Sequence, residues 1–585
     1  VIDFVTNHTS REMNPTANNI PEDGKLYEPD RKEDGTFAFD ENGEPYDYNG
    51  DGLVENLIAD PQNDTNGWFH GLGDRGDDSS RYGYRYKDLG SLADFSQENQ
   101  NVAAYLEQAT LFWADMGVNG IRHDATLHMD AAFAKGLKDA VDSHNTITQF
   151  GEFFIGRPDP KYDEYVYFPK QTGINNLDFE FYRAASATFG DFSTTMADFG
   201  NMLQYTQDDY DYENQAVTFL DNHDVTRFGY TQRSQKTYNA ALATLLTSRG
   251  VPNIYYGTEQ YVVPADGSDV SGRIFMQTDS SFDTDTTAYK LIGKLSELRQ
   301  QNDAIAYGTT TIRYSNDDVL IYERKFYDDV ILVAINRQPD KAYTIDNVET
   351  LLPEGEYVDF LGGMLNGENI SVYASTGINT TASITLDGGE VGIWQYDAAA
   401  NAPEIGNVVS TMGRAGNRVY IYGDGLDGNI SVKFGETEAT VESNTANEIV
   451  TYVPDNAVAG YNDITVTKGD AVSNSFTYNV LSGDQNQVIF HVKAETSYGE
   501  NFYIVGNVPE LGSWNPDKCT EALLNPNYPE WFLPVSVPAG TEIQFKFIKK
   551  DANGTVTWES GDNRVITSSS LSAGTVDTEV YTWRN

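Results

Sequence analysis

Short apolar runs alternate with amphipathic stretches through the first half of the chain. This alternation is typical of strands that are joined by crossover helices. Helical periodicity is clearest over residues 102–116 and 238–248, where apolar residues recur on one face. The pattern predicts six strands, at residues 1–5, 120–123, 147–153, 176–181, 217–220 and 253–256.

These strands suit an α/β fold, a (β/α)8 TIM barrel whose first two β/α units are missing from the chain. Between the first two strands lies a stretch rich in Gly, Asp, Asn and Tyr, about residues 9–99. It is too long for an ordinary loop, so we expect an inserted subdomain. The chain opens on the apolar run 1–5 without an initiator Met or a signal peptide, and we therefore expect it to be N-terminally truncated.

From residue 303 onward the pattern changes to alternating strands without long helices, which is typical of antiparallel all-β domains. A linker at Ala402-Pro403 separates two further blocks of short strands, of which the last is denser in aromatic residues. The sequence thus predicts a barrel remainder at 1–302 and all-β domains at 303–400, 401–482 and 483–585.

Composition excludes several classes of function. The 585 residues include 88 Asp or Glu and 39 Lys or Arg, so the formal net charge is −49 and nucleic acid is excluded as the default partner. The only cysteine, Cys519, excludes a disulfide within the chain and a thiolate metal cluster. No apolar run is long enough to span a membrane.

Three acidic residues follow predicted strands, and each is preceded by apolar residues: Asp124, Glu152 and Asp224. The carboxyl ends of barrel strands converge on one face, where active sites are built. Two carboxylates in one pocket push their pKa values apart, which leaves one as an acid and one as a nucleophile for glycosidic cleavage. Arg122, two residues before Asp124 on the same strand face, can hold a carboxylate ionised.

Four ordered segments carry a resemblance: Asp3-Phe-Val-Thr-Asn-His8, Gly120-Ile-Arg-His-Asp124, Gly151-Glu-Phe-Phe154 and Phe219-Leu-Asp-Asn-His-Asp224. They resemble the motifs of the α-amylase family of glycoside hydrolases. The segment 246–260 and the later all-β domains resemble its cyclodextrin glucanotransferase and maltogenic amylase branch, whose second and third β domains are an Ig-like sandwich of IPT/TIG type and a starch-binding module.

The resemblance implies an enzyme acting on α-1,4-glucans, with starch, maltodextrins or cyclodextrins as ligands. Asp124 would be the nucleophile, Glu152 the general acid and base, and Asp224 the stabiliser of an oxocarbenium-like transition state. Supporting contacts to the sugar would come from Arg122, His8 and His223, and donor-side binding from Asp269 and Arg273.

Two departures from the family bear on the reaction. Members that form cyclic dextrins place a large aromatic residue where this chain has Gly90, and the family usually has Lys-His where this chain has Leu127-His128. Because Lys-His grips the acceptor sugar, we expect hydrolysis to be favoured over cyclisation. Phe154 matches an acceptor-side aromatic of the transferase branch, so cyclising transglycosylation stays an alternative, as does a catalytically silent starch-binding fragment.

The resemblance also implies a calcium site formed by Asn7, Asp94 and His128, with His128 and a residue near Arg85 contributing backbone carbonyls. Oxygen ligands of this kind suit Ca²⁺. A second segment, Asp47-Tyr-Asn-Gly-Asp-Gly52, opens like a calcium loop but has Ile58 where the closing acid belongs, so an ordinary acidic turn is favoured.

In the last domain the resemblance assigns sugar-binding roles to Trp514, Tyr528, Lys546, Trp558 and Asn563. Exposed aromatic faces stack on glucose rings, and Asn563 can anchor a hydroxyl group. The expected protein is a secreted monomer, with export inferred from its polymeric substrate and its acidic surface.

Overall fold

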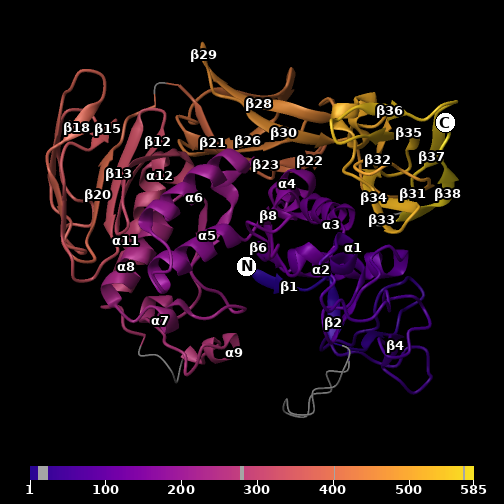
Figure 1. Ribbon diagram of the computed structural model, residues 1–585. Helices are drawn as coiled ribbons and strands as arrows, with labels where there is room; N and C mark the ends of the chain where they lie inside the picture. The colour runs from indigo at the N-terminus through magenta and orange to yellow at the C-terminus, as the bar shows by residue number, and fades with distance from the viewer. Residues whose placement is uncertain (11–23, 277–281, 401, 571–573) are drawn as a thin grey trace. The chain divides into compact units, whose positions relative to one another are not determined.

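The computed structural model describes residues 1–10, 24–276, 282–400, 402–570 and 574–585 (Figure 1). The chain divides into two compact units. The first combines residues 1–152 with residues 481–585, and the second comprises residues 153–480. Each unit is described separately below.

The first unit begins with three parallel strands in the order β1-β6-β7. Asp3 of β1 pairs with Arg122 of β6, and Arg122 pairs with Phe150 of β7. These are strands of the predicted barrel, and the helices α2 and α3 follow them. The elements are β1 (Ile2–Phe4), β2 (His8–Ser10), β5 (Leu92–Asp94), α2 (Gln100–Asp115), β6 (Gly120–His123), η1 (Thr126–His128), α3 (Ala131–His144) and β7 (Thr148–Gly151).

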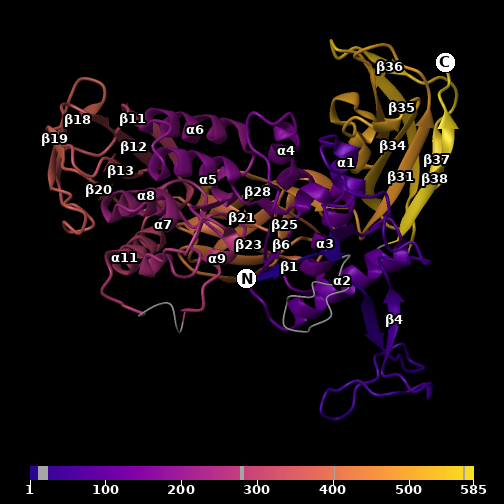
Figure 2. The same cartoon turned by 60° about the horizontal axis from the view of Figure 1, so that its bottom comes forward.

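The predicted insertion contains its own secondary structure. It holds the antiparallel hairpin of β3 (Leu26–Pro29) and β4 (Glu55–Ala59) and the short helix α1 (Arg81–Tyr86). Its apolar residues pack with those of α2 and α3 in one core that includes Trp68 and Phe95. Figure 2 shows β4 near α2.

The last residues of the chain complete the first unit as a β-sandwich (Figure 2). One sheet has the order β33-β34-β31-β38, and the other has β32-β35-β36 with β37 also paired to β35. Apolar side chains such as Phe490, Trp531 and Phe545 fill the space between the sheets. The elements are β31 (Gln485–Lys493), β32 (Asn501–Gly506), η5 (Pro509–Trp514), η6 (Pro516–Lys518), β33 (Leu524–Asn527), β34 (Glu530–Pro538), β35 (Glu542–Lys550), β36 (Val556–Trp558), β37 (Arg564–Thr567) and β38 (Thr575–Thr582).

Within this unit the sandwich packs on the barrel helices and on the insertion. Lys135 of α3 is buried, and burial lowers its pKa while the carboxylates of Glu510 and Asp139 oppose that shift. The ring of Tyr86 in α1 lies 5.5 Å from that of Phe532 in β34. The two ends of the chain therefore share one buried interface.

The second unit contains the remaining parallel strands. β9 pairs in parallel with β10, and Leu177, directly after β8, forms a parallel bridge to Val217 of β9. The elements are α4 (Tyr162–Thr172), β8 (Asn175–Asn176), α5 (Phe179–Ala185), η2 (Ser186–Gly190), α6 (Met196–Asp209), η3 (Glu213–Gln215), β9 (Val217–Phe219), α7 (Phe228–Thr231), α8 (Gln235–Thr247), β10 (Val251–Asn253), η4 (Thr258–Gln260), α9 (Asp269–Gly272), α11 (Thr287–Gln301) and α12 (Asp303–Tyr307).

Two strand predictions in this region were wrong in part. The predicted strand 176–181 ends at Asn176, because Asp178 accepts a hydrogen bond from the backbone N–H of Phe181 and begins helix α5. The predicted strand 253–256 is shifted toward the N-terminus, since β10 ends at Asn253.

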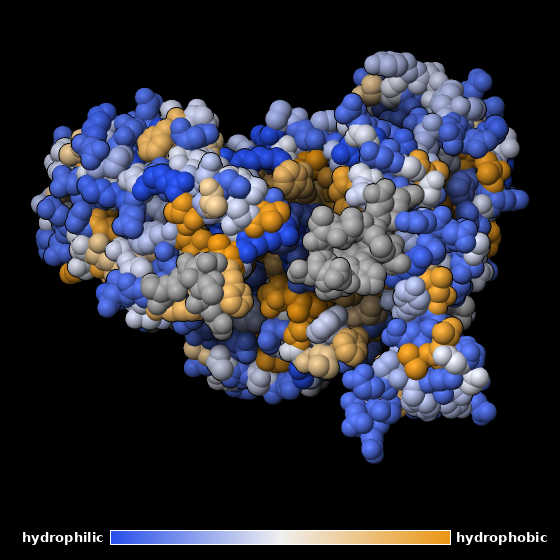
Figure 3. Space-filling view, turned by 90° about the horizontal axis from the view of Figure 1, so that it is seen from below, coloured by the Kyte–Doolittle hydropathy of each residue, from blue (hydrophilic) through white to orange (hydrophobic). Residues whose placement is uncertain are grey.

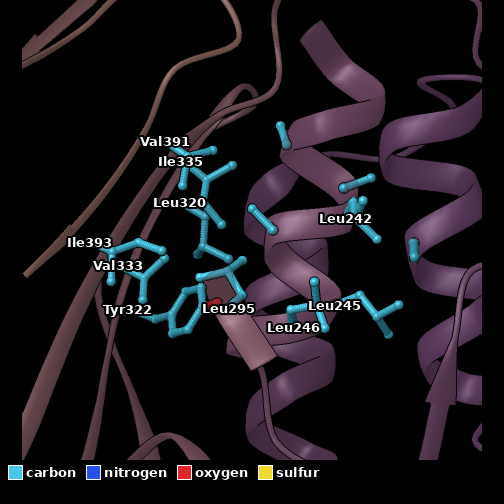
Figure 4. Packing of buried hydrophobic residues seen from close by; sticks show 14 of the residues in the cluster. Leu242, Leu245, Leu246, Leu295, Leu320, Tyr322, Val333, Ile335, Val391 and Ile393 are labelled. Atoms are coloured by element: carbon cyan, nitrogen blue, oxygen red, sulfur yellow. The ribbon is translucent and has the colours of Figure 1, made fainter. Parts of the chain in front are cut away.

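An antiparallel sheet of order β11-β12-β13-β20 follows the barrel elements. Its inner face packs against α8 and α11 through residues such as Leu246, Leu295 and Tyr322 (Figure 4). The elements are β11 (Thr309–Ser315), β12 (Val319–Phe326), β13 (Asp329–Asn336), β14 (Tyr343–Ile345), β15 (Glu349–Thr350), β16 (Gly355–Tyr357), β17 (Ile370–Tyr373), β18 (Asn379–Thr381), β19 (Ile384–Leu386) and β20 (Val391–Tyr396).

A second sandwich ends this unit. Its sheets have the orders β21-β23-β27-β26 and β22-β30-β28-β24-β25, with β29 paired to β28. The elements are β21 (Glu404–Val409), β22 (Met412–Arg414), β23 (Arg418–Asp424), β24 (Ile430–Phe434), β25 (Thr437–Ala439), β26 (Val441–Asn444), β27 (Glu448–Tyr452), β28 (Gly460–Lys468), β29 (Ala471–Val472) and β30 (Phe476–Leu481).

Candidate active site

Two of the predicted catalytic acids extend adjacent strands of the first unit. The backbone N–H of Asp124 donates to Phe4 at 3.0 Å, and that of Glu152 donates to His123 at 2.9 Å. Both residues thus continue the parallel ladder beyond the ends of β6 and β7. This placement puts two carboxylates at the carboxyl end of the sheet, as the sequence predicts.

Arg122 lies between these acids. Its Nη1 donates to Asp124 Oδ1 at 2.9 Å and also to Asp3, while its Nη2 lies 3.1 Å from Glu152 Oε1. One carboxylate oxygen of Asp124 lies within 4.8 Å of one of Glu152. This limit is compatible with a retaining glycosidase, whose carboxyl groups are about 5 Å apart.

Burial strengthens these charge interactions. The side chain of Arg122 is 7% exposed. Burial alone lowers the pKa of Arg122, but the carboxylates of Glu152, Asp3 and Asp124 more than offset this, so its pKa lies above the usual value. Arg122 therefore stays charged and fixes the geometry of the pair.

His8 approaches the same acid from β2. Its Nε2 lies 3.9 Å from Asp124 Oδ2. Burial lowers the pKa of His8, although Asp124 opposes the shift. A neutral imidazole can donate a hydrogen bond to a sugar hydroxyl without adding a full charge to the site.

Close packing also fixes the backbone next to the acids. A Cβ atom at Gly151 would lie 2.6 Å from two side-chain atoms of Thr126, so only glycine fits there without displacement. Thr126 is two residues beyond Asp124, and Ala125 between them adopts a left-handed φ of 53°. The turns after β6 and β7 are therefore packed against each other.

The third predicted acid belongs to the second unit. Asp224 lies five residues beyond the end of β9, and its Oδ1 and Oδ2 contact Arg273 Nη2 at 3.2 Å and His223 Nε2 at 2.9 Å. Arg273 also donates to Asp269 at 3.1 Å and to the carbonyl of His223 at 3.0 Å. The structure thus brings together four residues that the resemblance assigns to sugar binding and transition-state stabilisation.

Phe154 was predicted to lie on the acceptor side, and Gly90 to stand in the centre of the cleft where cyclising members of the family have an aromatic residue. Phe154 is 46% exposed, and its ring lies 4.3 Å from that of Phe179. Gly90 has a φ of +63°, and a Cβ built there has no neighbour within 4 Å. A side chain at position 90 would have space but would occupy a strained backbone conformation.

The predicted calcium ligands also lie together. Asn7 Nδ2 donates to Asp94 Oδ1 at 3.0 Å, and Asn7 Oδ1 is buried without a hydrogen-bond partner among the described residues. Rotating this amide by 180° would place its oxygen beside a carboxylate oxygen, which is the arrangement that a cation bridges. The residues therefore fit a hard cation.

The ring of His128 has a structural contact. Its Nδ1 lies 2.9 Å from the carbonyl of Tyr84, and burial lowers the pKa of His128 to about 4. The neutral ring consequently donates to that carbonyl. The backbone carbonyl of His128 is the atom that the resemblance assigns to the ion.

His70 contacts the predicted calcium ligand Asp94, and the sequence did not indicate this contact. It lies 2.6 Å from Asp94 through Nδ1 and 2.9 Å from Glu98 through Nε2. Burial lowers the pKa of His70, but the two carboxylates raise it by more than burial lowers it, so the pKa is about 10. No local motif indicates this contact, since His70 and Asp94 are 24 residues apart.

The second calcium-like segment forms its own turn. The Asp47 carboxylate accepts hydrogen bonds from the backbone N–H groups of Gly50 and Gly52, and Asp51 accepts one from Leu53. Such local hydrogen bonds are typical of an Asx-stabilised turn. They match the acidic turn that the sequence favours over a calcium loop.

Aromatic residues are exposed on the terminal sandwich. Trp558 is 40% and Tyr528 52% exposed, whereas Trp514 is half-buried. Lys546 donates to the carbonyls of Glu559 and Gly561, which hold its ammonium group beside the strand end that carries Trp558. Asn563 lies on the surface, 3.4 Å from Gln544.

Family models match four successive parts of the chain. The alpha amylase catalytic domain matches residues 1–266, the alpha amylase C-terminal all-beta domain 313–397, the IPT/TIG domain 403–481 and the starch binding domain 485–578. These matches confirm the predicted TIM barrel and the three types of β domain.

Relatives match along almost the entire chain. A cyclomaltodextrin glucanotransferase of Thermoanaerobacterium thermosulfurigenes is 44% identical over 98% of this chain and 77% of its own length. One from Paenibacillus macerans is 42% identical over 100% of this chain and 78% of its own. The crystal structure of a gamma-CGTase from alkalophilic Bacillus clarkii has a TM-score of 0.86 at 38% identity and covers 100% of this chain and 81% of that one.

The chain therefore belongs to the α-amylase family, and it is an enzyme that acts on α-1,4-glucans. Within the family it falls in the cyclodextrin glucanotransferase branch. Enzymes of this family commonly bind calcium. None of the described helices is long and apolar enough to cross a membrane.

Proposed function

We propose that this enzyme is a cyclising transglycosylase, which converts starch into cyclodextrins. The observation that carries the proposal is its similarity along nearly the whole chain to cyclomaltodextrin glucanotransferases. The similarity supports this reaction better than the hydrolysis that we expected from Gly90 and Leu127, because the curated relatives named above are cyclomaltodextrin glucanotransferases.

In the proposed reaction Asp124 attacks the anomeric carbon and Glu152 protonates the departing oxygen. A glycosyl enzyme forms, and Glu152 then deprotonates the acceptor hydroxyl that displaces Asp124. Arg122 holds the Asp124 carboxylate in place, and His8 hydrogen-bonds the sugar. Asp224, held by Arg273 and His223, stabilises positive charge on the sugar ring.

Hydrolysis is proposed as a competing outcome of the same intermediate. Gly90 offers no aromatic surface around which a glucan chain could curl, and the open space beside it admits water. Leu127 lacks the charge that would hold an acceptor sugar. We therefore expect cyclic products together with an unusually large share of linear ones.

The test is incubation with starch, with samples separated by chromatography from the first minutes onward. Cyclic dextrins among the early products support the proposal, and exclusively linear products would refute cyclisation. The Glu152→Gln variant serves as the control. Sugar release that is equally absent from the parent and this variant, with binding retained, would favour a catalytically silent starch-binding protein.

We propose Ca²⁺ as a structural ion held by Asn7 Oδ1, the Asp94 carboxylate and the backbone carbonyl of His128. A bound cation would offset the desolvation that raises the pKa of Asp94 to about 7. Because His8 pairs with Asp94 between β2 and β5, the ion would also brace the histidine beside the proposed nucleophile. Chelation should lower the unfolding temperature, and Asn7→Leu should remove that dependence on calcium.

The terminal sandwich is proposed to bind starch through Trp514, Lys546, Trp558 and Asn563, with Tyr528 in a second site. Its match to the starch binding domain supports this assignment. Replacing both tryptophans by alanine should abolish adsorption to granular starch and spare activity on soluble starch. Unchanged adsorption would contradict it. An enzyme that meets a polymeric substrate in this way is proposed to act outside the cell, as a monomer.

A further inference from the structure

An open groove lies between the β3–β4 hairpin and helix α2, all within the first unit. Its cavity volume is about 590 Å³. This volume lies within the range of ordinary ligand sites, which measure roughly 300 to 1000 Å³. None of the residues assigned above to catalysis, calcium or starch binding lines it.

One wall of the groove is a single face of α2. Asn101, Tyr105 and Gln108 line it, and their spacing of four and three residues places them in a row of roughly 10 Å along the helix. Asn101 and Gln108 are exposed, while Tyr105 is half-buried. An aromatic ring between two amides presents an apolar surface with hydrogen-bonding groups at each end.

The Tyr105 ring is held in place by a buried tryptophan. Trp68 is 7% exposed, and its ring lies 5.4 Å from that of Tyr105 at 66°. Asn99, which caps α2, donates to the carbonyls of Asn66 and Gly67 and so ties the segment of Trp68 to the start of the helix. The floor and the wall are therefore organised before any ligand arrives.

The opposite side carries a fixed pair of charges. Arg31 donates to Glu28 through Nε at 3.2 Å and through Nη2 at 2.8 Å, and its guanidinium lies 4.3 Å from the centre of the Phe37 ring. Glu28 and Arg31 line the groove together with Tyr105. Burial and then the Glu28 carboxylate raise the pKa of Tyr105. The guanidinium and carboxylate groups pair with each other, and Arg31 Nη1 also donates to the carbonyl of Gly35. The second N–H of each Nη and the remaining lone pairs of the Glu28 oxygens can still bond sugar hydroxyl groups.

We propose that this groove is a further carbohydrate-binding site, which holds a length of α-1,4-glucan away from the catalytic acids. An apolar ring flanked by amides and by a guanidinium–carboxylate pair matches a sugar chain, which has apolar ring faces and a dense rim of hydroxyls. The choice of an α-glucan rests on the proposed function and on the starch binding domain in the same chain. A second binding site for the polymer would raise the effective concentration of the polymer at the enzyme.

The test is affinity electrophoresis through gels that contain amylopectin. The parent is the Glu152→Gln enzyme, in which Trp514, Tyr528 and Trp558 are also replaced by alanine, so that neither digestion nor the terminal module affects migration. We expect this parent to be retarded. Tyr105→Ala and Gln108→Ala should each weaken the apparent binding roughly three- to tenfold.

Tyr373→Ala is the control, because Tyr373 is an exposed tyrosine of the all-β domain, 54% accessible, that does not line the groove. It should migrate like the parent. Gln108 lies on the surface, so its variant tests the groove even if Tyr105→Ala unfolds. Equal retardation of parent, Tyr105→Ala and Gln108→Ala would overturn the proposal, as would equal retardation in gels of a β-1,4-glucan. A failure of cyclisation would appear separately, in the products of the unmodified enzyme.

Discussion

Arg122 and Arg273 each hold a proposed catalytic carboxylate, but in different surroundings. The side chain of Arg122 is 7% exposed and contacts three carboxylates, whereas that of Arg273 is 46% exposed and contacts two. Charges interact strongly where water is excluded and weakly where it is present. The first cluster is thus built for fixed geometry, and the second can adjust to a sugar.

The largest expected effect on activity comes from replacing the buried Arg122. Arg122→Leu leaves three carboxylates without their shared cation, and removing one partner from a buried ion cluster costs roughly 3 to 5 kcal/mol. We expect kcat/KM on soluble starch to fall at least about 100-fold. Arg122→Lys should fall less, since it keeps the charge but loses the two-pronged contact. A loss below threefold in both variants would show that burial does not strengthen this cluster.

The next effect concerns pH. Burial lowers the pKa of His123, between Arg122 and Asp124, to about 4, below the value of about 6.5 in the unfolded chain. Its neutral form stabilises the fold above pH 6.5, and that stability, about 3 kcal/mol, is lost as the pH falls from 6.5 to 4. Denaturant titrations across this range should show a shallower pH dependence for His123→Gln. The exposed His144→Gln serves as the control, and identical slopes for both variants would contradict the prediction.

A smaller effect is expected from packing around the buried cluster. Gly151→Ala forces a methyl group against Thr126, and overpacking of this kind costs roughly 1 to 3 kcal/mol. The unfolding temperature and kcat should both decrease. The double variant with Thr126→Ser, which removes one of the two opposing atoms, should recover part of both. No recovery would mean that Gly151 matters for another reason.

The smallest effect is expected on the exposed side. Arg273→Gln should lower kcat/KM only about two- to fivefold, because an ion pair at this exposure contributes roughly 0.2 to 1 kcal/mol. Salt should reproduce part of this loss in the parent but not in the variant, since ions screen exposed charges. The contrast between the two sites fails if kcat/KM of the parent, of the Arg122 variants and of Arg273→Gln depends on salt in the same way.

The sequence predicted those parts of the fold that local patterns determine. β6 has the predicted bounds, from Gly120 to His123, and all four of its residues are buried. The segment 176–181 contains more apolar residues, but the capping side chain of Asp178 makes it helical. Hydrophobic periodicity alone does not distinguish these two outcomes over so few residues.

The candidate site was predictable as a set of acids but not as a set of contacts. Asp3 was not singled out, although it reaches Arg122 because the parallel register places them side by side. His70 likewise joins Asp94 and Glu98 only through folding of the insertion. Pairing between distant segments leaves no spacing that can be read along the chain. Much of the face in Figure 3 is hydrophilic, as the many acidic residues lead one to expect, although hydrophobic residues also gather on it.

The first unit joins residues 1–152 to residues 481–585, and this has a consequence for synthesis. A ribosome adds about 5 to 20 residues per second. Synthesis of the intervening segment of about 330 residues therefore delays residues 481–585 by roughly 20 to 60 s. During that interval Lys135 and the face of α3 around it stay uncovered, because the residues that pack on them have not yet been synthesised. Slowing translation should therefore lengthen the time for which this face can be captured by a chaperone or by another nascent chain.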